Sequence, residues 1–399
     1  MFESFTQKEL IIRLSLDVLL RFFSFYSLYF NFVPQSTESM RKTYFTPGPA
    51  ELFPTVEKHY HDAFEQQLGS ISHRSQKFRD TYKHTAEQLR ILMNIPESMG
   101  IFFTGSATEI WERIIQNTVE HESFHLVNGS FSKKFCDCSL DLNKYAHKME
   151  KPFGEGFDNS EIEVPEYAEL ICATANETSS GVQMRPAEIH KLKRANKDKF
   201  VCVDMVSSAP YPDLDFNTVD SAFFSVQKSF GMPAGLGCWI VNRAMLEKSE
   251  RMKTHENHIG TYHSLPALFK NFEKYETPET PNVIAIYVLG KVAEDFNKIG
   301  IENLRKQTEK KAKMLYEFAE KSNYLDIFVK NPEHRSQTVV VVNVKEKSAA
   351  DIIKQVQTEA NMIIGSGYGD FKDTQLRIAN FNAVNLGQIE ELIEALKKV

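Results

Sequence analysis

Short apolar runs alternate with helical patterns between residues 76 and 242. Each apolar run ends in polar or glycine-rich turn residues, which predicts buried strands followed by turns. The stretches that contain these runs are 100–119, 123–131, 168–181, 199–210, 219–228 and 235–242, and helical periodicity covers 76–93, 186–195 and the second half of 100–119. This alternation predicts a mainly parallel sheet with helices on both faces. In such sheets ligands bind at the carboxyl ends of the strands, where the polar turns lie.

The pattern changes after about residue 281. Two long helical segments come first, then strand-like and helical runs alternate to the end of the chain. We expect helices over 282–300, 301–321, 348–364 and 385–399, and strands over 337–345 and 374–381. The chain is therefore predicted to be an α/β protein with a large domain over 40–285, including an N-terminal arm over 40–75, and a small α+β domain over 286–399.

Residues 1–39 differ from the rest of the chain because they are dense in Leu, Ile and Phe. The uncharged run 22–33 is too short to span a bilayer as a helix. It fits a membrane-surface helix, a poor signal peptide or translation from a wrong start codon. We favour Met40 as the natural start, because "RKTYFTPGPAELFP" begins directly after it. N-terminal sequencing of the protein from its own host tests this, and an intact Met1 would refute it.

The composition is that of a folded globular protein, with 399 residues, 42% of them hydrophobic and 25% charged. A net charge of -6 gives no general attraction to nucleic acid or to an anionic membrane, and we expect neither as a partner. Five scattered cysteines fit free thiols in a reducing compartment, so we expect a cytoplasmic protein. Cys136 and Cys138 have no matching Cys/His pair, so we expect no metal site.

Three features carry candidate chemistry, although each has an ordinary explanation when taken alone. "TGSATE" (104–109) between a strand and a helix is typical of a helix cap, but its amides also suit a phosphate. Asp204 ends an apolar strand, and Lys228 follows the next one. Pyridoxal phosphate needs phosphate donors, an acid for its pyridinium nitrogen and an amine for its aldehyde. Together, and in this order, the three features predict a site for that cofactor.

The chain resembles the class-V aminotransferases of fold type I, and among them the phosphoserine aminotransferases. The resemblance runs from about residue 44 to the C-terminus. It rests on "FTPGPAELFP", "SISHRSQKF", "ANETSSGV", "VDMVSS", "SVQKSFGMPAGLG" and "LRIANFNA", in the family's order. The lysine motif is the most specific of these.

The resemblance implies a role for each matching residue. Lys228 binds the cofactor covalently and, with Asp204 at the pyridinium nitrogen, is catalytic. The other implied cofactor contacts are Ala107 and Thr108 at the phosphate, Gln227 also at the phosphate, Phe131 stacked on the ring, Thr178 beside its phenolic oxygen, and Thr280 at the phosphate of the neighbouring subunit. Arg377 is implied to hold the substrate's α-carboxylate, while His73 and Arg74 face the substrate of the partner subunit. A homodimer with shared sites follows.

Departures from the family's pattern leave the substrate open. The turn 105–108 has no arginine, "GSGYGDFKDTQLR" lacks the family's His-Arg pair, and Glu279 replaces an asparagine. His73, Arg74 and Lys372 are the cations that could compensate. A transaminase acting on phosphoserine and 2-oxoglutarate in serine biosynthesis is the first expectation. An alanine– or serine–glyoxylate type of exchange, or a related class-V enzyme, is the close alternative, and a non-catalytic or membrane-associated scaffold is the alternative of a different class.

Overall fold

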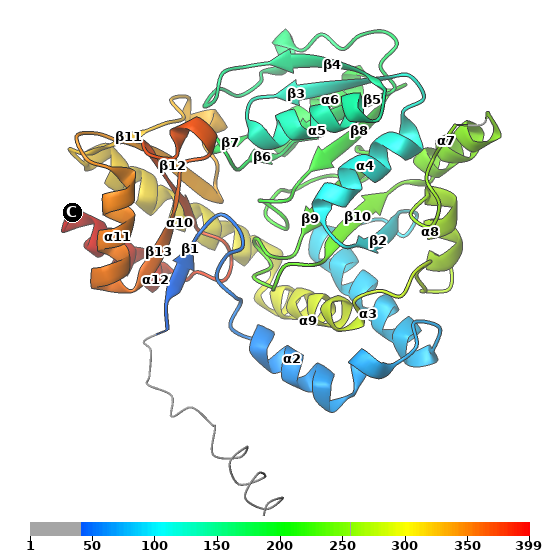
Figure 1. The fold of residues 1–399 in the computed structure, drawn as a ribbon, viewed down its shortest axis with the longest axis horizontal. Helices are drawn as coiled ribbons and strands as arrows, with labels where there is room; N and C mark the ends of the chain where they lie inside the picture. Colours follow the sequence, from blue (N-terminus) through cyan, green and yellow to red (C-terminus); the bar gives the residue numbers. More distant parts are fainter. Residues whose placement is uncertain (1–40, 256) are drawn as a thin grey trace, which may run out of the picture. The chain divides into compact units, whose positions relative to one another are not determined.

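A seven-stranded sheet forms the centre of the larger part of the fold (Figure 1). A computed structural model describes residues 41–255 and 257–399, so the expectation for residues 1–39 lies outside it. The strand order is β2-β10-β9-β8-β5-β3-β4. The bounds are β2 (Gly100–Thr104), β3 (Glu122–Val127), β4 (Tyr145–Glu150), β5 (Leu170–Thr174), β8 (Phe200–Asp204), β9 (Ser221–Ser225) and β10 (Gly237–Val241). The neighbours from β9 to β4 pair in parallel, whereas β10 runs antiparallel to β2 and β9. The predicted mainly parallel sheet is confirmed.

Both faces of this sheet are buried. Ile101 and Phe103 of β2 pack into one core, and Phe102 between them packs into the other. Such alternation follows from the two-residue period of a strand, and it explains why the strands read as continuous apolar runs. Helices α3 (Gln76–Met93), α6 (Pro186–Ala195) and α9 (Val283–Ile299) contribute to the first core, and helices α4 (Ala107–Thr118), α5 (Ser130–Asp141), α7 (Arg243–Thr254) and α8 (Leu265–Phe272) to the second.

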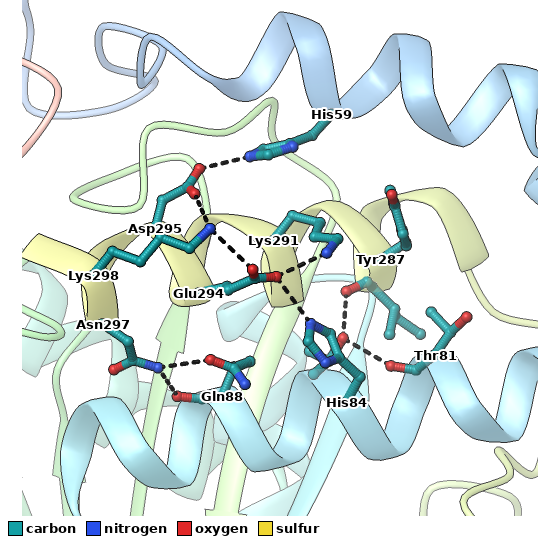
Figure 2. A network of polar contacts seen from close by, with 12 residues as sticks. His59, Thr81, His84, Gln88, Tyr287, Lys291, Glu294, Asp295, Asn297 and Lys298 are labelled. Atoms are coloured by element: carbon teal, nitrogen blue, oxygen red, sulfur yellow. Dashed lines mark hydrogen bonds and ion pairs between the residues drawn. The ribbon is translucent and has the colours of Figure 1, made fainter.

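Polar contacts hold α9 to helices α2 (Val56–Glu65) and α3, as Figure 2 shows. His59 of α2 lies 2.7 Å from the carboxylate of Asp295. On α9 itself, hydrogen bonds from Lys291 and Lys298 lower the pKa of Glu294 to about 2. The Asn297 amide donates to the Gln88 side chain of α3 at 2.9 Å. The helices therefore pack with their exposed edges joined by ion pairs and amide hydrogen bonds.

A second sheet of five strands has the order β1-β13-β14-β12-β11. The bounds are β1 (Thr43–Phe45), β11 (Leu325–Ile327), β12 (Val339–Val344), β13 (Met362–Ser366) and β14 (Gln375–Ala379). Helices α10 (Ile301–Lys321), α11 (Ala349–Ala360) and α12 (Leu386–Lys397) share one apolar core with it. Strand β1 pairs in parallel with β13, so the start of the described chain joins its C-terminal sheet. The domain boundaries at 40–285 and 286–399 remain a prediction.

The helix predicted over 348–364 is wrong in its last part. Helix α11 ends at Ala360, and Asn361 adopts a left-handed conformation with φ of 57°. Residues Met362–Ser366 instead form β13, between β1 and β14. The apolar residues after Asn361 continue the helical pattern, and a short apolar run cannot by itself distinguish a helix from a strand. The edge strand β4 was also not expected, because its sequence "YAHKME" is largely polar.

A short hairpin joins β6 (Asn176–Glu177) to β7 (Val182–Gln183) beside the large sheet. All five cysteines are free, as predicted, and four of them are buried. In the part of the chain that the structure describes, no helix has the length and apolar character needed to cross a membrane.

Candidate active site

The carboxyl ends of several strands of the large sheet surround one cavity of about 220 Å³. Strands β2, β5, β8 and β9 end at Thr104, Thr174, Asp204 and Ser225, and the last three of these residues line the cavity. Seven of the predicted site residues line it too: Ala107, Thr108, Phe131, Thr178, Asp204, Gln227 and Lys228. These residues come from distant parts of the sequence, and the parallel strands bring them to one edge of the sheet.

Lys228 lies three residues after β9, with 9% of its surface exposed. Its amine donates a hydrogen bond to the carbonyl of Pro47. Gly48 packs directly against the lysine, since a Cβ at this position would lie 2.4 Å from Lys228 Cδ, and its φ of +117° suits glycine. Burial, together with the positive charge of Arg377, lowers the pKa of Lys228 to about 8. Near neutral pH a far larger fraction of this amine is therefore neutral and nucleophilic than of an ordinary lysine.

Asp204 ends β8 with 4% of its surface exposed. Burial raises the pKa of Asp204 to about 7, against the effect of the Val206 amide that donates to Oδ1 at 2.9 Å. The indole of Trp111 donates to Oδ2 at 3.3 Å and also lines the cavity. Sequence reasoning missed Trp111. Its spacing of three from Thr108 and four from Ala107 puts it on the same face of α4, and this was the available signal.

The turn before α4 has the predicted shape, with Ser106 capping the helix through its side chain and Ala107 as the first helical residue. The first amides of a helix have no acceptor within it, and they attract anions. At the edge of this turn the carboxylate of Glu109 accepts the Gly105 amide at 3.0 Å and pairs with His263. Burial of His263 opposes its charged form, but hydrogen bonds to Glu109 and Glu279 outweigh this and raise its pKa to about 9. An acid–histidine pair thus lies next to the arginine-free turn.

Glu177 fixes the start of α5, which carries Phe131. Its fully buried carboxylate accepts the Phe131 amide at 3.2 Å, the Ser132 amide at 2.8 Å and the Ser179 amide at 3.0 Å. Gly129 must be glycine here, because a Cβ would lie 2.3 Å from Glu177 Cγ. A carboxylate at a helix N-terminus is favourable both through hydrogen bonds and through the helix dipole. Sequence reasoning gave Glu177 no role, although it stands in the "NETSSG" motif.

Arg377 lies on β14 of the second sheet, next to the cavity. Its Nε donates to the Ser366 carbonyl at 2.8 Å and its Nη1 to the Thr178 carbonyl at 3.4 Å. The guanidinium carbon lies 5.3 Å from the ring centroid of Tyr368. The two sheets therefore place a guanidinium beside a residue that lines the cavity.

His73, Arg74 and Thr280 form a separate group and do not line this cavity. Thr280 Oγ1 lies 3.5 Å from His73 Nδ1. Arg74 is paired with the carboxylate of Glu276 and donates to Asn271 at 3.0 Å. Their predicted role, toward the cavity of a partner subunit, stays a prediction.

The chemistry of the cavity fits pyridoxal phosphate. A buried amine and a buried carboxyl group face the same space, and the start of α4 provides amides for a phosphate. The Oε1 atom of Gln227 is buried without a hydrogen-bond partner among the described residues, as expected for a polar group that awaits a ligand. Lys228, Asp204 and the residues Ser106–Thr108 would hold the aldehyde, the ring nitrogen and the phosphate respectively.

A sequence model of the family described as class-V aminotransferases matches residues 148–369, more than half of the chain. The chain belongs to the class-V aminotransferase family. Curated relatives of this aminotransferase include a phosphoserine aminotransferase from Nocardioides sp., 26% identical over 82% of this chain and 88% of the relative. Another, from Rhodococcus opacus, is 25% identical over 88% of this chain and 92% of the relative.

Solved structures agree with the fold of this class-V aminotransferase. A phosphoserine aminotransferase from Cytophaga hutchinsonii is 46% identical, has a TM-score of 0.87, and covers 90% of this chain and 98% of its own. An alanine–glyoxylate aminotransferase from Nostoc sp. is 21% identical, with a TM-score of 0.78 over 91% of this chain and 96% of its own. The second likeness shows the fold alone. The fold class and the aminotransferase activity predicted from the sequence are both confirmed.

Proposed function

We propose that this aminotransferase moves the amino group of phosphoserine to 2-oxoglutarate, in the biosynthesis of L-serine. The observation that carries the proposal is the meeting of Lys228 and Asp204, both buried, in one cavity at the strand ends. The choice of substrate is supported by the 46% identity to the solved phosphoserine aminotransferase and by the curated relatives with the same name.

Each residue around the cavity has a proposed task. Bound there, pyridoxal phosphate would supply an electron sink for the negative charge that forms at the substrate's α-carbon. Asp204 would keep the ring nitrogen protonated, Phe131 would pack against the ring, and Thr178 would lie beside its phenolic oxygen. Ala107, Thr108 and Gln227 would hold the phosphate. Trp111 would orient the Asp204 carboxylate through its indole hydrogen bond.

Lys228 and Arg377 would act on the substrate. Arg377 presents a planar fork of donors, which suits two-point binding of an α-carboxylate. When its amine is free, Lys228 would act as the general base that takes the proton from the substrate's α-carbon. Its lowered pKa of about 8 favours this, because a base works best when its pKa is close to the operating pH.

The assembly and location of the protein belong to the same proposal. We infer a cytoplasmic homodimer in which Thr280 reaches the partner's cofactor phosphate, while His73 and Arg74 face the partner's substrate. The exposed contact between His73 and Thr280 is consistent with this, because it lies outside the cavity of the same chain.

A half-reaction screen tests the substrate. The cofactor-loaded protein is mixed separately with phosphoserine, glutamate, serine and alanine, and conversion of its visible absorbance to that of the amino form is followed. Conversion by phosphoserine and glutamate is expected. If alanine or serine converts the protein while phosphoserine does not, an alanine– or serine–glyoxylate exchange replaces the proposal.

Covalent attachment is tested independently of turnover. Borohydride reduction of the loaded protein should attach the cofactor to the peptide that contains Lys228, and Lys228→Ala should abolish the attachment. A wild-type protein that stays colourless after reconstitution would refute the assignment.

A further inference from the structure

Tyr368 lies between two cations beside the cavity. The ammonium of Lys134, on α5, is 5.4 Å from the Tyr368 ring centroid and donates to its hydroxyl at 2.8 Å. The guanidinium of Arg377 is 5.3 Å from the same centroid. The ring of Tyr368 also packs 5.2 Å from that of Phe131, which lines the cavity. Two residues of α5 and one of β14 thus converge on one aromatic ring.

Neither cation has an ion-pair partner in the part of the chain that the structure describes, and the buried Glu177 carboxylate acts on Arg377 only through space. Among residues 41–255 and 257–399, no carboxylate forms an ion pair with Lys134 or Arg377. The adjacent lysine on the same helix differs, because Lys133 pairs with Asp137 at 2.7 Å. Burial lowers the pKa of Lys228, and the charge of Arg377 adds to this effect, so Arg377 acts electrostatically on the cavity. An anionic ligand that reached Lys134 and Arg377 would pair with both positive charges.

The hydrogen-bond directions favour an anion as well. Because Lys134 donates to the Tyr368 oxygen, the phenolic hydrogen stays available for another acceptor. The ammonium keeps further N–H groups for the same acceptor. Lys134 and Arg377 lie 5.4 Å and 5.3 Å from the Tyr368 ring centroid, so the distance between the two cations is at most the sum of these values. A small amino acid with a second acidic group can bridge that span between its two anionic ends.

We propose that Lys134 and Tyr368 form the subsite for the distal anionic group of the substrate, a phosphate or a carboxylate, while Arg377 holds the α-carboxylate. This inference rests on the proposed transaminase function and adds residues that determine its specificity. It also explains how the cavity can lack an arginine in the 105–108 turn. There, the Gly105 amide already donates to the Glu109 carboxylate, so it is not free to bind a second anion.

Binding of unreactive acids tests the subsite without turnover. Glutarate carries two carboxylates and butyrate carries one, and both lack the amino group. Calorimetric titration of the cofactor-loaded protein should show tighter binding of glutarate, and Lys134→Ala should reduce this preference roughly 10- to 100-fold, the equivalent of one charge-assisted hydrogen bond. Tyr368→Phe should reduce the preference for glutarate over butyrate less, and Lys134→Arg should retain most of that preference. Lys133→Ala is the matched control, which should leave it unchanged.

Kinetics distinguish the two sources of the distal anion. Lys134→Ala should raise KM for glutamate, phosphoserine or both, and leave alanine unaffected. An effect on phosphoserine alone assigns the subsite to phosphate, and an effect on both assigns it to any distal anion. Equal losses for acidic and neutral ligands, or an equal loss in Lys133→Ala, would overturn the inference. If the wild type converts no amino acid, the proposed function fails, and the preference for glutarate still decides the subsite.

Discussion

Replacement of Glu177 by glutamine should destabilise the protein much more than an ordinary surface change of the same kind. The carboxylate is fully buried and accepts the amides of Phe131, Ser132 and Ser179, as well as both serine hydroxyls. In the glutamine variant, the side-chain NH2 group can point toward Ser179. The Ser179 hydroxyl can then rotate and accept a hydrogen bond from this NH2 group instead of donating one. At least one backbone N–H then loses its acceptor, and the remaining bonds change from charged to neutral.

The magnitude follows from these contacts. A hydrogen bond to a charged group contributes about 1.5–3 kcal/mol, and a neutral one about 1 kcal/mol. The interaction of the carboxylate with the N-terminus of α5 adds about 0.3–1 kcal/mol. The amide is less costly to bury than the carboxylate, which offsets part of the loss. Glu177→Gln should therefore lower the free energy of unfolding by about 2–3 kcal/mol.

Urea unfolding of the cofactor-free protein measures this value. The two tryptophans, Trp111 and Trp239, both contact the large sheet, so their fluorescence follows the part of the fold that contains Glu177. The control is Glu247→Gln, an exposed glutamate on α7. Amide hydrogen exchange at Phe131 and Ser132 should accelerate only in the Glu177 variant. If both variants unfold at the same urea concentration, Glu177 is not the cap that holds α5.

Three further predictions concern the cavity. Trp111→Phe removes the indole donor to the Asp204 carboxylate, so cofactor affinity should fall roughly 10-fold, the effect of a charge-assisted hydrogen bond at the low end of about 1.5–3 kcal/mol, and equilibrium titration measures it. The amine of Lys228 reacts only when neutral, so the rate at which the cofactor-free protein recombines with cofactor should rise with pH through about 8 and then level off; a rate that keeps rising toward the ordinary value of 10.5 would contradict this. Arg377→Ala should raise KM for every amino-acid substrate by roughly 10-fold or more, since all share the α-carboxylate, and steady-state kinetics that show an effect on one donor alone would argue against its role.

Much of the large sheet could be predicted from the sequence. Its central strands are buried on both faces, so they appear as continuous apolar runs between turn residues. The edge strand β4 is half exposed and polar, and therefore lacks that signal. Strand β13 was hidden because the apolar residues after α11 continue the helical pattern, and only Asn361, in its left-handed conformation, ends the helix.

Some residues of the candidate site could likewise be predicted from the sequence, and others could not. Residues of the cavity that stand in contiguous motifs, such as Asp204 and Lys228, were identified from the sequence. Glu177 and Trp111 act through contacts to residues that are distant along the chain, and neither residue type is diagnostic of a site by itself. Glu177 of β6 caps α5, and the Trp111 indole donates to the Asp204 carboxylate. These roles can be recognised only when the fold has placed each residue beside its partner.

The sequence by itself predicted the cofactor chemistry, because a phosphate turn, an acid and an amine each follow a strand, and local motifs record their order. Only the tertiary structure decided the surroundings of Arg377. Lys134 lies on α5, Tyr368 precedes β14, and 234 positions separate the two. The fold places the segment between β13 and β14 beside α5, which brings the two side chains within hydrogen-bonding distance. No periodicity encodes such a contact, because it depends on where the fold places two segments that are distant along the chain.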